Sequence, residues 1–124
     1  MMEKEMKYVL NTDIEKQYEY FIKKVADFGK VWSLKDLDGW VTLGVEEDEF
    51  FPIWPKKEFA EICIGEEWDD CYAESIDLED FLDDWINGLK EDNIRITVMW
   101  NNGSGIDREW DRLREDIEIE LEKY

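Results

Sequence analysis

The sequence contains no histidine, only two cysteines and two prolines, and few cations: 15 lysines and arginines against 34 acidic residues. Without histidine the chain lacks the commonest general base and the middle member of serine and cysteine triads, which excludes hydrolases of that type. Cys63 and Cys71 cannot complete a zinc shell of the usual kind, so no metal or cofactor is expected. We interpret them as reduced thiols, although their spacing also permits a bridge.

Long hydrophobic runs are also absent. No segment approaches the roughly 18 uninterrupted apolar residues of a membrane helix. The start of the chain, residues 1–7, mixes charges of both signs and has no apolar segment behind it, which fits neither a secretory signal nor a transit peptide. These absences predict a cytoplasmic protein that does not associate with membranes.

Apolar residues are nevertheless abundant. Hydrophobic side chains make up 44% of the 124 residues and aromatic ones 15%, which is too much apolar material for a disordered acidic chain. The length is typical of one domain, and no linker is long enough to divide it. Residues 1–124 are therefore expected to fold as a single domain.

The negative charge is concentrated in one part of the chain. Residues 1–31 carry six acidic and six basic side chains, so the whole net charge of −19 lies in residues 32–124. Residues 46–92 alone hold 18 acidic side chains and three lysines. Such a field repels phosphate backbones and anionic lipids and attracts basic surfaces. Binding of nucleic acid is disfavoured, and the favoured partner is a basic protein.

An amphipathic helix is predicted near the start of the chain. Apolar residues recur at spacings of three and four from Thr12 to Phe28, which places them on one helix face. Thr12 with Glu15 matches the capping box, and Gly29 supplies a left-handed stop. Further helices are expected over residues 55–65, where Gly65 ends the helix, over 77–90, and over 106–123.

Three short strands are predicted to follow the first helix as a meander. Residues 31–36 and 40–45 flank an Asp-Gly pair, which is a strong hairpin signal. The acidic turn Glu46–Glu49 leads to a third strand over 50–54, and Pro52 places that strand at an edge or a bulge. An extended piece is expected around 72–76, and a half-buried strand over 94–100 precedes a flexible connector, 101–105.

The expected order is helix, three strands, helix, helix, strand, helix. Consecutive strands with such short turns must be antiparallel. The prediction is therefore an α+β fold, with an antiparallel or mixed sheet of about four strands and helices packed on it. The strand order and the oligomeric state stay open.

Several spaced motifs resemble those of the domain of unknown function 2750 family, which consists of small uncharacterised bacterial proteins. The resemblance covers roughly residues 12–100. It implies a fold and a bacterial cytosolic setting, but no activity, and no residue role can be transferred. The residues that carry it are Tyr20-Phe21, Val31-Trp32-Ser33-Leu34, Asp38-Gly39-Trp40, Pro52-Ile53-Trp54-Pro55, Trp68, Ile76 through Trp85, and Leu89.

The helix expected over 77–90 carries more negative charge than its local structure explains. Asp83 and Asp84 lie beyond the first turn, where the helix dipole no longer favours them, and they repel Asp80 and Glu79 at spacings of three and four. A basic partner would use such a surface, because complementary charge speeds association. A surface that only maintains solubility would show the same charge.

We therefore hypothesise a non-enzymatic acidic module, immunity- or inhibitor-like, that docks a basic protein through residues 46–92. The candidate partner-binding residues are Asp80, Asp83, Asp84, Glu46, Glu47 and Glu49. No catalytic residue is singled out.

The alternative hypothesis is a small-molecule binder or enzyme with a Trp-lined, carboxylate-containing pocket. Most of the seven tryptophans belong to apolar faces, which favours core packing. Trp54 and Trp68 lie beside loops and are the ones expected to be partly exposed. The segment 102–105 has neither the spacing of a nucleophile elbow nor the lysine of a phosphate-binding loop.

Overall fold

The computed structural model describes residues 4–64 and 68–124. The strands are β1 Lys30–Asp36, β2 Gly39–Trp40, β3 Leu43–Val45, β4 Asp48–Ile53, β5 Tyr72–Asp77, β6 Ile94–Asn101 and β7 Ser104–Arg108. The helices are α1 Lys4–Leu10, α2 Ile14–Phe28, α3 Lys57–Glu61, α4 Leu78–Asp80, the π-helical η1 Phe81–Trp85, α5 Ile86–Glu91 and α6 Trp110–Leu121.

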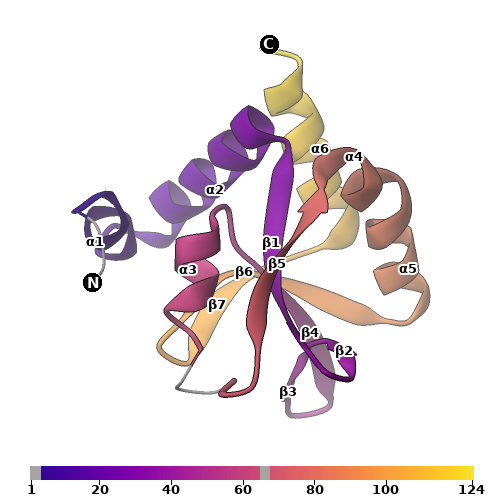
Figure 1. The fold of residues 1–124 in the computed structure, drawn as a ribbon. Coiled ribbons are helices and arrows are strands. Elements are labelled where there is room, and N and C mark those ends of the chain that lie inside the picture. Colours follow the sequence, from indigo (N-terminus) through magenta and orange to yellow (C-terminus); the bar gives the residue numbers. More distant parts are fainter. Residues whose placement is uncertain (1–3, 65–67) are drawn as a thin grey trace.

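The expected α+β class is confirmed. Two sheets lie at the centre of the molecule and helices surround them (Figure 1). One sheet has the order β2-β1-β5 and is antiparallel. The other has the order β3-β4-β6-β7 and is mixed, because β4 and β6 run parallel.

The first predicted helix forms as α2, but its cap is not the expected one. The carboxylate of Asp13 accepts a hydrogen bond from the Lys16 N–H at 2.9 Å. The Thr12 hydroxyl instead donates to the Val9 carbonyl at 2.6 Å, because α1 ends just before α2 and presents that acceptor. Gly29 closes α2 in the left-handed conformation, with φ of 69°, as predicted.

The predicted three-strand meander is wrong, although its first hairpin is confirmed. β1 pairs with β2 across the Asp-Gly turn, as the register of Asp36 with Gly39 shows. After Trp40 the chain leaves this sheet, and β3 pairs with β4 in the other one. The run 40–45 therefore contributes to both sheets.

The two sheets meet where β1 crosses the end of β4. The backbones of Trp32 and Trp54 exchange two hydrogen bonds of 2.8 Å, and the buried Ser33 hydroxyl donates to the Pro52 carbonyl at 2.6 Å. β4 lies between β3 and β6 and pairs with both in regular register, so the expectation that Pro52 marks an edge or a bulge is wrong. Pro52 is tolerated because the pairing with β3 ends at Phe50 and its missing N–H faces β1 rather than β6.

The connector predicted over 101–105 is also wrong. β6 turns through Asn102 and Gly103, whose φ angles are 51° and 84°, and returns as β7. Both residues tolerate positive φ, which a two-residue hairpin turn requires. Ile106 consequently lies in a strand, and α6 begins at Trp110 rather than at 106.

The remaining helices form close to their predicted ranges. α3 begins at Lys57, and the expected stop at Gly65 lies outside the described residues. The helix predicted over 77–90 runs continuously from Leu78 to Glu91 as α4, η1 and α5. The extended piece expected around 72–76 is β5, which pairs with β1 along its whole length.

Buried apolar side chains form one cluster that reaches from Met6 in α1 to Ile117 in α6. All seven tryptophans belong to it or pack against it, so the prediction that most of them serve the core is confirmed. Trp85 is one of the half-buried ones: its ring centroid lies 5.0 Å from that of Trp40 and 5.4 Å from that of Phe51. These contacts hold the helix from Leu78 to Glu91 against both sheets.

Candidate functional site

The six candidate partner-binding carboxylates are all exposed, but they fall into two groups. Asp80, Asp83 and Asp84 lie on α4 and η1, and we call them the helix triad. Glu46 and Glu47 lie at the turn between β3 and β4, Glu49 lies in β4, and we call these three residues the hairpin triad. Figure 1 shows the β3 hairpin and α4 at opposite ends of the molecule. The fold therefore does not gather the six residues at one site.

Residues 46–92 likewise do not form one continuous face. Figure 1 shows α3 on one side of β1 and β5, and α4 and α5 on the other side. The segment also contributes buried side chains, among them Phe51, Phe59 and Phe81. Only a part of this segment can therefore form a docking surface, and the helix triad and the hairpin triad are the two candidate parts.

Neither triad is neutralised within residues 4–64 and 68–124. None of the ion pairs formed there includes a member of either triad. Glu49 does accept a hydrogen bond of 2.6 Å from the Thr42 hydroxyl. The helix triad differs from the hairpin triad in this respect, because its carboxylates make no such bond in the described part of the chain.

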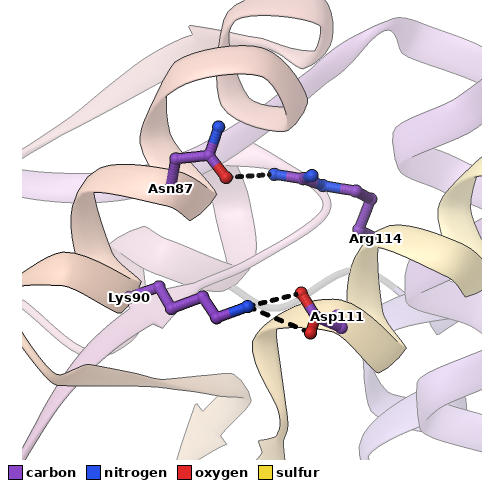
Figure 2. A network of polar contacts seen from close by, with 4 residues as sticks. All are labelled: Asn87, Lys90, Asp111 and Arg114. Atoms are coloured by element: carbon purple, nitrogen blue, oxygen red, sulfur yellow. Dashed lines mark hydrogen bonds and ion pairs between the residues drawn. The ribbon is translucent and has the colours of Figure 1, made fainter.

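Two cations, Lys90 on α5 and Arg114 on α6, lie between these two helices, and other groups bind them (Figure 2). Lys90 contacts both carboxylate oxygens of Asp111 at 3.1 Å. Arg114 donates to the Asn87 side-chain carbonyl at 2.9 Å, and the Asn87 amide donates to the Asp83 backbone carbonyl at 3.0 Å. These bonds fasten α5 to α6. They also leave the carboxylates of the helix triad uncompensated.

A small surface cavity of about 300 Å³ lies directly beside the helix triad. We call it the notch; it is lined by Asp84, Trp85, Gly88, Leu89 and Asp92. Its walls come from η1, α5 and the residue that caps α5. The notch thus combines one aromatic side chain with two exposed carboxylates.

The expectation that Trp54 is partly exposed is wrong. Trp54 is only 1% exposed, because its backbone pairs with Trp32 where the sheets meet and its indole N–H donates to the Trp100 carbonyl at 2.9 Å. Trp68 is half-buried, and its ring packs edge-on against Trp54 with centroids 6.3 Å apart. Trp54 therefore cannot line an open binding site.

Sequence reasoning missed a groove between α2 and α6. The Tyr18 hydroxyl donates to Asp116 at 2.5 Å, Arg112 pairs with Asp116 at 3.0 Å, and the Arg108 guanidinium lies 4.2 Å from the Tyr18 ring centroid. Burial, together with the hydrogen bond to Asp116, raises the pKa of Tyr18 well above its usual range. The spacing of Arg112 and Asp116 is the one signal that the sequence offered.

This groove has a volume of about 470 Å³, and four cationic and four acidic side chains line it. Its charges therefore balance, in contrast to the helix triad. No group of three potential metal-ligating side chains occurs among the residues that the structure describes. In the same part of the chain, no helix is long and apolar enough to cross a membrane.

The chain matches the family described as a protein of unknown function, DUF2750, over residues 18–117, and it belongs to this family. The matched range begins in α2 and extends into α6. It therefore includes most of the final helix, which lies beyond the range 12–100 of the sequence resemblance. No curated protein matches the chain.

Proposed function

We propose that the protein is a non-enzymatic acidic module that docks a basic protein through the helix triad. The observation that supports this proposal is the uncompensated charge of Asp80, Asp83 and Asp84, which are exposed on one helix. Like charges three or four residues apart on a helix cost about 0.2–0.5 kcal/mol per pair. A basic partner would offset that cost on binding, because it would place cations between these carboxylates.

The same proposal places the protein in the cytoplasm without a cofactor. Cys63 and Cys71 are not joined by a disulfide, as expected in a reducing compartment. The strong negative charge argues against nucleic acid as the partner, because a phosphate backbone would be repelled.

The two triads provide a matched pair of variants for testing the proposal. Three aspartates of the helix triad or three glutamates of the hairpin triad are replaced by lysine, and either change alters the net charge from −19 to −13. Each protein is immobilised and exposed to lysate of the native cell at low and high salt. Retained proteins are identified by mass spectrometry, and the affinity of each is then measured with purified components.

We expect one basic protein to bind the wild type and the hairpin variant, and the helix variant to lose it. High salt should weaken the complex, because exposed charge pairs are screened. If the helix variant binds the partner as tightly as the wild type does, the proposal is wrong. If neither variant nor wild type retains a protein, screening of metabolites by tryptophan fluorescence tests the alternative of a small-molecule site.

A further inference from the structure

Gly88 has no role in the fold that requires a glycine. It lies inside α5, and its φ is not in the left-handed region. A Cβ added there would meet no atom within 4 Å. A glycine inside a helix lowers the folding equilibrium constant by about two- to fivefold relative to alanine. This destabilising glycine lines the notch, and its lack of a side chain leaves the notch open.

The other residues of the notch favour a cation. Asp84 and Asp92 are exposed, and neither forms an ion pair in the described residues. Asp92 caps the C-terminal end of α5, where the helix dipole disfavours a carboxylate. Lys90, the one basic residue in that last turn, is bound to Asp111. A positive group in the notch would therefore be stabilised by both carboxylates and by the helix end.

The size of the notch limits what can occupy it. Its volume of about 300 Å³ is at the lower end of the range for small-molecule sites, about 300–1,000 Å³, and it is open to solvent. A single long side chain of a docked protein suits such a space better than a metabolite does. Trp85 adds an aromatic wall, and cations are attracted to tryptophan rings.

We propose that the notch receives an arginine side chain of the basic partner. This inference rests on the proposed function and names the contact at its centre. A guanidinium group is planar, presents several donors to carboxylates and stacks on aromatic rings, whereas the lysine ammonium is a more strongly hydrated point charge. Arginine is also enriched among the residues that dominate the affinity of protein interfaces.

The test uses hexa-arginine and hexa-lysine peptides as probes at physiological salt. Binding is followed by NMR on the indole N–H signals of the 15N-labelled protein, and the Trp85 signal is assigned with Trp85→Phe. We expect hexa-arginine to bind more tightly than hexa-lysine. The Trp85 signal should shift most and should reach saturation.

Gly88→Ala and Gly88→Met place a small and a large side chain in the notch without removing any charge. We expect the affinity for hexa-arginine to fall in that order, to about a tenth for Gly88→Met, because the cation loses its contact with Trp85. The melting temperature of Gly88→Ala should rise, since alanine is the better helix former. Gly44→Ala is the matched control: it adds the same methyl group to the acidic hairpin, where the nearest atom is 3.9 Å away.

The inference is wrong if Gly88→Met binds hexa-arginine with an affinity within twofold of that of the wild type. If the lysine variant of the helix triad nevertheless loses the peptide, the proposed acidic docking surface stands and only the role of the notch is refuted. If that variant also binds normally, the peptide is held elsewhere, and both proposals fail.

Discussion

Replacement of Gly105 by alanine should destabilise the protein strongly, although the sequence suggests a tolerant loop. Gly105 lies in β7, and an added Cβ would be 2.1 Å from the Thr97 hydroxyl oxygen and 3.3 Å from the Trp100 Cα atom. The first distance is far below contact, and the β-branched Thr97 side chain has few alternative rotamers. Overpacking of this kind costs about 1–3 kcal/mol.

Thr97→Ala should relieve the clash. Thr97 is fully buried, and its hydroxyl has no hydrogen-bond partner among the described residues. Removing the buried unpaired hydroxyl should raise the free energy of unfolding by about as much as losing the buried methyl group lowers it. Thr97→Ala alone should therefore change this free energy by less than about 1 kcal/mol. The double variant should recover most of the stability that Gly105→Ala loses, which gives a coupling energy of about 1–3 kcal/mol.

Urea unfolding followed by tryptophan fluorescence measures all four proteins of this cycle. For a domain of this size, each kcal/mol corresponds to a change of about 3–5 °C in the melting temperature, which provides a second measurement. The reasoning is refuted if Gly105→Ala unfolds at the same urea concentration as the wild type. It is also refuted if Thr97→Ala gives no rescue, because the hydroxyl would then not be the obstacle.

Three further predictions concern other parts of the structure. Trp54→Phe should lower the unfolding free energy by about 2 kcal/mol in urea, because it removes the hydrogen bond to Trp100 and part of a buried ring; an unchanged midpoint would contradict this role. Burial raises the pKa of Tyr20 to about 12 from 10.0, so its contribution to stability is present below pH 10 and is lost between pH 10 and about 12; Tyr20→Phe should show a smaller loss over that interval in urea titrations. Burial, followed by the charges of Asp36, Asp70 and Asp69, raises the pKa of Cys71. Iodoacetamide should therefore alkylate Cys71 more slowly at pH 8 than it alkylates free cysteine. Cys71 should be alkylated faster in the Asp70→Asn variant, and an alkylation rate equal to that of the wild type would show that the charge of Asp70 does not act.

Local patterns predicted the elements whose partners are close in sequence. The stripe from Ile14 to Phe28 and the stop at Gly29 needed only helical spacing and one left-handed residue. The hairpin between β1 and β2 needed only the Asp-Gly pair. The Asn102-Gly103 pair, whose residues both have positive φ, is an equally local hairpin signal, so the turn that replaces the predicted connector is also encoded between neighbours.

The candidate site was predictable in its charge but not in its shape. The sequence identified the exposed carboxylates of both triads, because acidic residues are rarely buried. It could not show that α4 and the β3 hairpin lie at opposite ends of the molecule, since this depends on how the two sheets meet. Nor could it show the notch, which arises where Gly88 and Trp85 face the same surface.

The residues alone were sufficient to predict the α+β class, the family and the helices with clear periodicity, and they show the concentration of negative charge in residues 32–124. Three features became visible only in the folded chain: residues 40–45 are shared by two sheets, β4 lies beside β6, and Trp54 is buried. The physical reason is that helical spacing and turn residues act between neighbours along the chain. Pairing between distant strands instead depends on the burial of apolar side chains in one common core, where the position of each strand depends on all the others.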